Sequence, residues 1–185
     1  MTLRSITQTI TMLGCGKMGG ALLSAWLEAG LSPSQVSLIE PNTSSVEAFK
    51  SLGCQVVTSL EALGGDHRPD CLMVALKPQI IPDILPQAQK ILGENTLVLS
   101  IAAGLGVLKF KEMTSVAQPV VRIMPNTPAS VGEGMAAAFA SSEVSDELIA
   151  MVDSLLKAGG QSVWLDNEEQ MHAVTAISGS GPAYV

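Results

Sequence analysis

The chain has 185 residues, of which 47% are hydrophobic and 15% are charged, so a folded core is expected and extensive disorder is not. Its formal net charge of −7, without a basic cluster or stacking aromatic residues, argues against a nucleic-acid partner. A membrane partner is not expected, because no apolar run approaches the roughly 20 residues that span a bilayer.

The cysteines and histidines bear on the compartment and on metal binding. The chain has three cysteines, Cys15, Cys54 and Cys71, and no Cys-x-x-Cys pair. An odd number without such a pair favours reduced, mostly buried thiols in a cytoplasmic protein. A glycine loop begins so near the first residue that no secretory leader is expected before it. His67 and His172 have no second ligand at metal-binding spacing, so no metal is expected.

The first predicted strand, Ile6 to Leu13, runs into the sequence Gly14-Cys15-Gly16-Lys17-Met18-Gly19, and a helix ending at Gly30 follows. In this context Gly-x-Gly-x-x-Gly is typical of a dinucleotide-binding turn. Gly14 is expected to make the tight corner, Gly16 to let backbone approach a pyrophosphate, and Gly19 to let the helix pack on its strand. The phosphates would then lie at the positive end of the helix. Cys15 is expected to contribute its backbone and not a catalytic thiol.

Strands and helices alternate along the rest of the chain. Strands are predicted at 36–39, 55–57, 71–76, 96–101 and 119–123, with two added strands at 135–140 and 161–165. Helices are predicted from residue 44 to 52, from a Ser59 cap to Gly64, around Ile80 to Leu85, at 107–111, from a Ser145 cap to Gly159, and at 167–177. The alternation predicts an α/β fold with a doubly wound parallel sheet, Rossmann-like, carrying two extra strands.

In such a sheet ligands bind beyond the carboxyl ends of the strands, where the strand order reverses. Four segments of unusual composition are predicted there: Gly14 to Gly19, Ala75-Leu76-Lys77-Pro78, Ala102-Ala103-Gly104 and Met124-Pro125-Asn126-Thr127-Pro128. Small residues allow a flat ring such as nicotinamide to approach the backbone, and Asn126 is an amide pre-aimed by its flanking prolines. Each proline taken singly is better explained as shaping a loop, but their convergence on one edge favours a site.

The sequence is compatible with two roles for Lys77 and with two roles for residues 178–181. Lys77 either faces phosphate or substrate, or lies solvated at a helix start. Ser178, Gly179, Ser180 and Gly181, which precede Pro182, either form an anion site for a small carboxylate at a helix N-terminus or belong to an ordinary Ser-capped helix.

Together these segments resemble the pyrroline-5-carboxylate reductase family. The matching segments are residues 14–19, 75–78, 98–104, 122–129 and 178–184, in family order. The resemblance implies a reductase that transfers hydride from NADPH or NADH to the C=N carbon of a cyclic imine carboxylate, 1-pyrroline-5-carboxylate, and forms L-proline. The alternatives are another NAD(P)-dependent imine or β-hydroxyacid reductase, or a non-catalytic dinucleotide-binding module.

The resemblance also implies roles for individual residues. The cofactor would be bound by Gly14, Cys15, Gly16, Lys17, Met18, Gly19, Glu40, Asn42, Ala75, Leu76, Lys77, Pro78, Ile101, Ala102, Ala103, Pro125 and Asn126. The substrate would be bound by Asn126, Ser178, Gly179, Ser180 and Gly181. Glu40 suits the ribose 2′-hydroxyl of NAD, whereas the donors after it suit a 2′-phosphate, so the cofactor is written NADP or NAD.

The family has a C-terminal helical domain that forms a homo-oligomer and encloses the substrate. Residues 1–165 are accordingly expected to form the cofactor domain, and residues 166–185 to begin the helical domain, which is otherwise missing. No residue of the chain is a convincing proton donor for the imine nitrogen, so this chain alone is expected to bind cofactor and to catalyse poorly.

Overall fold

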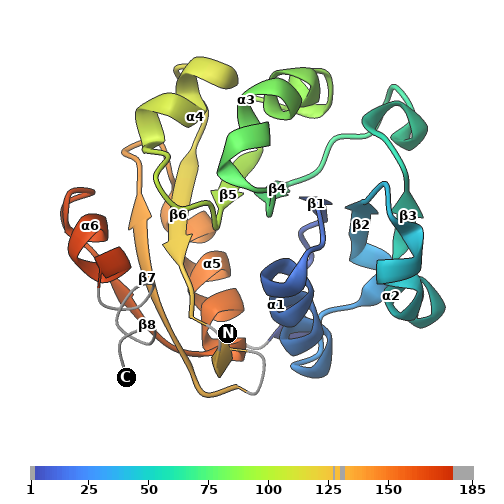
Figure 1. Cartoon of the computed structure of the whole chain (residues 1–185), viewed down its shortest axis with the longest axis horizontal. Coiled ribbons are helices and arrows are strands. Elements are labelled where there is room, and N and C mark those ends of the chain that lie inside the picture. The colour runs from blue at the N-terminus through green and yellow to red at the C-terminus, as the bar shows by residue number, and fades with distance from the viewer. Residues whose placement is uncertain (1–2, 127, 130–131, 177–185) are drawn as a thin grey trace.

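The computed structural model describes residues 3–126, 128–129 and 132–176. These residues form one sheet in the order β3-β2-β1-β4-β5-β6-β7-β8 (Figure 1). The strands are β1 (Ile10–Leu13), β2 (Val36–Ile39), β3 (Gln55–Val57), β4 (Cys71–Val74), β5 (Leu97–Ser100), β6 (Val120–Met124), β7 (Gly134–Ala140) and β8 (Gly160–Trp164). Strands β1 to β6 are parallel, β7 runs antiparallel to β6, and β8 is parallel to β7. The doubly wound sheet and its two extra strands are thus confirmed, with the order reversing between β1 and β4.

Helices cover both faces of the sheet. The α-helices are α1 (Lys17–Glu28), α2 (Glu47–Leu52), α3 (Ile81–Ile84), α4 (Val107–Met113), α5 (Asp146–Ala158) and α6 (Gln170–Thr175). Short 3₁₀ helices are η1 (Leu3–Ser5), η2 (Pro33–Gln35), η3 (Thr43–Val46), η4 (Leu60–Leu63), η5 (Pro78–Ile80) and η6 (Leu85–Ile91). In Figure 1, α3 and α4 lie on one side of the sheet, and α1 and α5 lie on the other.

Each face has its own apolar core because successive strand residues point to opposite sides. Ile10 and Met12 of β1 face α1 and α5, whereas Leu13 packs with the core under α3 and α4. On the first face, Trp26 of α1 is buried and its indole N–H donates to the carbonyl of Leu155 at 2.9 Å. This bond joins α1 to α5 without leaving a buried polar group unpaired.

The largest difference from the predicted elements lies at the start of the chain. The strand predicted from Ile6 begins only at Ile10, because the neighbouring strands start at Val36 and Cys71, directly opposite Ile10. Residues 6–8 therefore have no strand to pair with, and Thr9 pairs with β4 only through its carbonyl, which accepts the N–H of Cys71 at 3.0 Å. Instead, the backbone N–H and hydroxyl of Thr9 bind a carboxylate oxygen of Asp70 at 2.7 and 2.8 Å.

Several predicted helices are shorter or broken. The helix predicted from residue 44 divides into η3 and α2, and the proline-containing helix divides into η5, α3 and η6, since proline lacks the N–H that an α-helix needs. Ser59 makes no side-chain capping bond, and the segment after it is a 3₁₀ helix. Ser145 caps α5 as predicted, its hydroxyl oxygen accepting from the N–H of Leu148 at 3.3 Å. Of the helix predicted at 167–177, residues 170–175 are α-helical and Ile177 lies outside the described residues.

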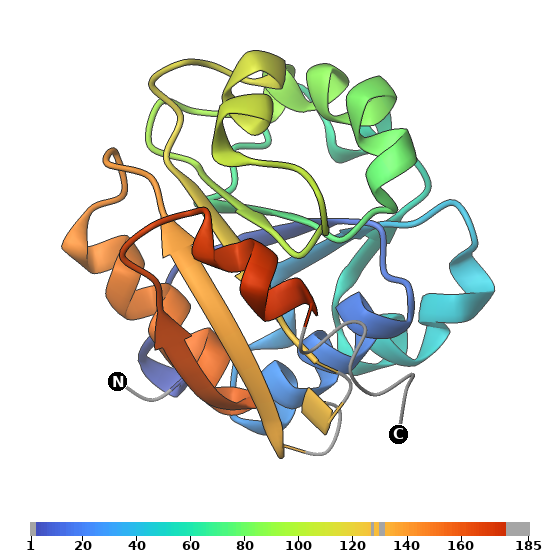
Figure 2. The same ribbon diagram turned by 60° about the vertical axis from the view of Figure 1, so that its left-hand side comes forward.

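Helix α6 lies beside β7, as Figure 2 shows, and Met171 is buried with Met124 and Ala137 of the sheet. The segment before α6 is held by an ion pair in which the guanidinium Nη1 of Arg122 lies 2.5 Å from Oε1 of Glu168. The same oxygen accepts the N–H of Val107, the first residue of α4, at 2.7 Å. Glu168 thus joins α4, β6 and the chain leading to α6. The predicted boundary at residue 165 stays a prediction. Among the described residues, no helix is both long and apolar enough to cross a membrane.

Candidate functional site

The loop between β1 and α1 has the geometry of a phosphate-binding turn. Gly14 has φ +79°, and a Cβ on it would lie 2.7 Å from Cδ2 of Leu76 and 3.1 Å from the carbonyl oxygen of Ala75. A Cβ on Gly19 would lie 3.0 Å from Cβ of Ala75, so the helix passes close to the end of β4. A Cβ on Gly16, by contrast, would have no heavy atom within 4 Å. The corner, the open approach and the close packing predicted for the three glycines are all present.

Gly16 is the N-cap of α1 and has no side chain to cap the helix. The first-turn N–H groups of a helix have no partner within that helix, and its N-terminal end carries partial positive charge. The space beside Gly16 is open, since a Cβ there would meet no atom within 4 Å. A helix start of this kind is a common binding site for phosphates in proteins.

Glu40, which directly follows β2, is bound to this loop. Its Oε2 accepts the backbone N–H of Cys15 at 3.0 Å, and its Oε1 accepts the backbone N–H of Asn42 at 3.1 Å. The half-buried carboxylate thus links the end of β2 to the phosphate loop. Both partners are main-chain groups, so the position of the carboxylate is set by the fold.

Two hollows flank Glu40 at the carboxyl edge of the sheet. The first, of about 570 Å³, has apolar walls that include Leu60, Ile80 and Ile84. The second, of about 500 Å³, lies at the start of α1 and is lined by Lys17 and Asn42 among others. Predicted cofactor residues line one or both hollows: Gly14, Cys15, Gly16, Lys17, Glu40, Asn42, Ala75, Leu76 and Lys77. A third hollow of about 690 Å³ precedes β5 and β6, at the edge where sheets of this type do not bind ligands.

The other predicted cofactor residues lie outside these hollows. Met18 and Gly19 are in α1, Pro78 begins η5, and Ile101, Ala102 and Ala103 follow β5, beside β4 in the sheet. Lys77 is exposed and lines the first hollow, at the end of β4.

Pro125 and Asn126 follow β6 at the same edge. Oδ1 of Asn126 accepts the N–H of Met135 at 2.9 Å, and its backbone carbonyl accepts the N–H of Ala129 at 3.2 Å. The first of these bonds holds the side-chain amide of Asn126 in place. Thr127 lies outside the described residues, as do Ser178, Gly179, Ser180 and Gly181, so the predicted substrate loop stays a prediction.

Sequence reasoning missed the contribution of the β3 end. Thr58 and Ser59 follow β3 and line the first hollow together with Leu60 and Glu61. They are at the carboxyl edge of a parallel strand, so the strand-end rule that identified the other segments would have found them. The apolar positions Ile80 and Ile84 were predicted only as helix residues.

Cys15 is buried in the phosphate loop, and its thiol is not activated. A helix N-terminus lowers the pKa of a thiol, but here burial, followed by the nearby Glu40 carboxylate, raises the pKa of Cys15 from 9.0 to about 11. Burial also raises the pKa of Cys54 and of Cys71. These shifts support the prediction that Cys15 is not a catalytic thiol.

The thiols of the folded protein are therefore expected to react slowly with Ellman's reagent at pH 8. A pKa of about 11 in place of 9.0 lowers the thiolate fraction of Cys15 at pH 8 about a hundredfold, and the thiolate is the reacting form. Protein unfolded in guanidinium should titrate all three cysteines at once. A fast phase of one thiol in the folded protein, lost in Cys15→Ser, would contradict this assignment.

Comparison with known proteins places this geometry in context. Residues 9–104 match the family model described as NADP oxidoreductase coenzyme F420-dependent. The chain is 36% identical over 175 residues to the pyrroline-5-carboxylate reductase of Haemophilus influenzae, covering 95% of this chain and 64% of that protein. The chain thus spans slightly less than two thirds of the length of this relative.

Solved structures agree. A pyrroline-5-carboxylate reductase from Coxiella burnetii superposes with a TM-score of 0.89 at 29% identity, over 97% of this chain and 66% of that one. The Plasmodium falciparum pyrroline carboxylate reductase, solved with NADP bound, superposes with a TM-score of 0.81 at 28% identity. This match covers 96% of this chain and 64% of that one. These findings confirm the fold and the resemblance that the motifs indicated.

Proposed function

Since the chain belongs to the family NADP oxidoreductase coenzyme F420-dependent, we propose that it is the dinucleotide-binding part of a pyrroline-5-carboxylate reductase. The observation that carries the cofactor role is the open space beside Gly16 at the start of α1, in a loop closed by Gly14 and Gly19. The similarity to pyrroline-5-carboxylate reductases over 95% of the chain supports the choice of substrate.

The residues present fit a nicotinamide dinucleotide. The apolar walls of the first hollow suit a flat base, and the loop beside Gly16 suits a pyrophosphate. The ends of β5 and β6 would then receive the nicotinamide ring, with the amide of Asn126 orienting a carboxamide or the substrate carboxylate. When bound, NAD(P)H supplies the hydride that reduces the C=N carbon of the cyclic imine.

The predicted site residues provide binding and orientation but not proton transfer. The imine nitrogen must gain a proton during reduction, and water must be excluded from the reacting atoms. Among the described residues, the predicted site residues at the ends of β5 and β6, which are Ile101, Ala102, Ala103, Pro125 and Asn126, carry no ionisable side chain. We propose that enclosure and assembly into a homo-oligomer depend on a helical domain following α6, and that the protein is cytoplasmic, in keeping with its free cysteines.

The test separates cofactor binding from turnover. The 185-residue protein is expected to bind NADH or NADPH in a fluorescence titration and to form proline from pyrroline-5-carboxylate only slowly, detected by mass spectrometry over hours. Oxidation of a β-hydroxyacid, measured in parallel, should be absent. Turnover of the hydroxyacid would favour another reductase, and failure to bind either dinucleotide would refute the proposal. Binding without any proline would favour a non-catalytic module if it persisted in a protein that also carries the helical domain.

A further inference from the structure

Glu40 lies beside the space expected for the adenosine ribose, the part of the cofactor in which NAD(H) and NADP(H) differ. We propose that this site prefers NAD(H), whose adenosine ribose has a free 2′-hydroxyl, over NADP(H), whose 2′-oxygen carries a phosphate, and that Glu40 determines this preference. The inference rests on the proposed function, and it departs from the family description, which names NADP.

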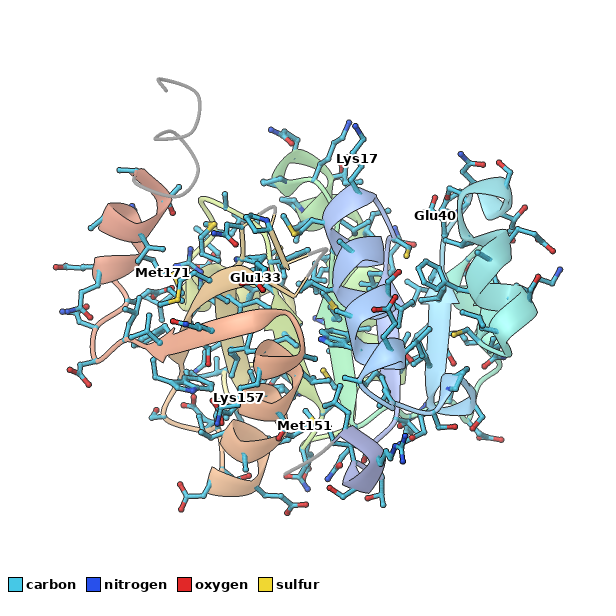
Figure 3. All side chains as sticks on the ribbon, turned by 90° about the horizontal axis from the view of Figure 1, so that it is seen from below. Lys17, Glu40, Glu133, Met151, Lys157 and Met171 are labelled. Atoms are coloured by element: carbon cyan, nitrogen blue, oxygen red, sulfur yellow. The ribbon has the colours of Figure 1, made fainter. Side chains whose placement is uncertain are left out.

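The position of Glu40 follows from the two hollows. It lines both of them, with the apolar walls on one side and the start of α1 on the other. Figure 3 shows Lys17, at the start of α1, and Glu40 at the same edge of the molecule. A dinucleotide with its base in the first hollow and its pyrophosphate beside Gly16 must place the connecting ribose next to Glu40.

The carboxylate is held in place and retains acceptor capacity. Each of its oxygens receives one backbone N–H, from Cys15 at 3.0 Å and from Asn42 at 3.1 Å. A carboxylate oxygen has lone pairs for a further hydrogen bond, so a ribose hydroxyl can donate to it without displacing either N–H. A phosphate at the same place would meet a fixed negative charge that cannot swing away without breaking both bonds.

Four of the hydrogen-bond donors near Glu40 that would suit a 2′-phosphate are already engaged. The hydroxyl of Ser44 donates to Oδ1 of Asn42 at 2.6 Å, and the hydroxyl of Ser45 donates to the carbonyl of Asn42 at 2.7 Å. The N–H groups of Cys15 and Asn42 donate to Glu40 itself. Ser44 and Ser45 are two of the four residues, with Asn42 and Thr43, whose donors left the choice of cofactor open in the sequence.

Positive charge is also scarce on this side of the site. Of the described residues that line the second hollow, Lys17 alone carries a positive charge. It is exposed in the first turn of α1, beside the space for the pyrophosphate. On the side of the second hollow, a 2′-phosphate near Glu40 would therefore compete with the pyrophosphate for the same lysine, whereas a 2′-hydroxyl needs no cation.

Binding measurements on the 185-residue protein test the inference. NADH and NADPH are titrated by fluorescence, and ADP-ribose and its 2′-phosphate by calorimetry, which removes the nicotinamide from the comparison. The protein is expected to bind NADH and ADP-ribose at least about tenfold more tightly than their 2′-phosphates, since one charge-assisted hydrogen bond is gained and one repulsion avoided. In Glu40→Gln this ratio should fall to near one, with weaker NADH binding and stronger NADPH binding.

Glu28→Gln is the matched control, because Glu28 is an exposed carboxylate in the last turn of α1, at the other end of the helix from the loop. It removes the same charge and should leave both affinities unchanged. Equal or tighter binding of NADPH by the unaltered protein would overturn the inference while leaving the proposed function intact, and this comparison does not depend on the stability of any variant. Failure to bind any of the four ligands would overturn both.

Discussion

Gly16→Ala is expected to weaken dinucleotide binding on the order of tenfold or more while changing the free energy of unfolding by less than about 0.5 kcal/mol. The backbone at Gly16, with φ −68° and ψ −170°, is one that any residue adopts, and a Cβ there meets no protein atom within 4 Å. The methyl group would instead occupy the space assigned to the pyrophosphate. A fluorescence titration with NADH and a urea denaturation curve measure the two quantities.

Gly14→Ala is the contrasting variant two residues away. Its φ of +79° costs an alanine about 1–2 kcal/mol, and contacts of 2.7 Å with Leu76 and 3.1 Å with Ala75 add to that. The melting temperature should fall by several degrees, at about 2–4 °C per kcal/mol for a chain of this size. If Gly16→Ala destabilised the protein as much as Gly14→Ala, the assignment of Gly16 to ligand binding would be wrong.

Glu168→Ala is expected to destabilise the folded protein by about 3–5 kcal/mol. Arg122 is only 8% exposed, and its Nε has no hydrogen-bond partner among the described residues, so loss of Glu168 leaves a buried cation unpaired. The variant also removes the acceptor of the Val107 N–H at the start of α4, where Gly106 offers no side-chain cap. Urea denaturation followed by circular dichroism measures the loss.

Two further variants test whether the loss of stability in Glu168→Ala comes from the unpaired charge of Arg122 or from shortening a glutamate side chain. Glu112→Ala breaks the exposed ion pair with Lys109, whose side chains are 63% and 60% exposed, and should cost less than about 1 kcal/mol. Arg122→Met added to Glu168→Ala should recover a large part of the stability, because no unpaired charge is then buried. An equal loss in Glu112→Ala and Glu168→Ala would show that the Arg122 ion pair has no special role.

The sequence was most informative where a local pattern has one structural solution. The run from Gly14 to Gly19 predicted three separate properties: a tight corner, an open approach and close packing. The structure has a positive φ at Gly14, open space beside Gly16 and a close contact at Gly19. The strand predicted at 71–76 is found as β4, and its four residues are buried. Boundaries were less accurate, as at Ile6 to Thr9, because a strand extends only as far as its neighbours do.

Contacts between distant segments could not be predicted in this way. Nothing near Glu168 in the sequence indicates that it pairs with Arg122, 46 residues away, and accepts the N–H of Val107, 61 residues away. The donors after Glu40 supported either cofactor until the structure showed that the serine hydroxyls and backbone N–H groups are engaged locally.

By itself, then, the sequence determined the fold class, the phosphate loop and the edge of the sheet that forms the site, because periodicity and glycine geometry are local properties of the chain. The tertiary structure alone decided how Glu40 is held and which donors remain for a ligand. It also decided how α4 and α6 are joined to β6. These depend on which groups the fold brings within hydrogen-bonding distance, and sequence separation does not determine that distance.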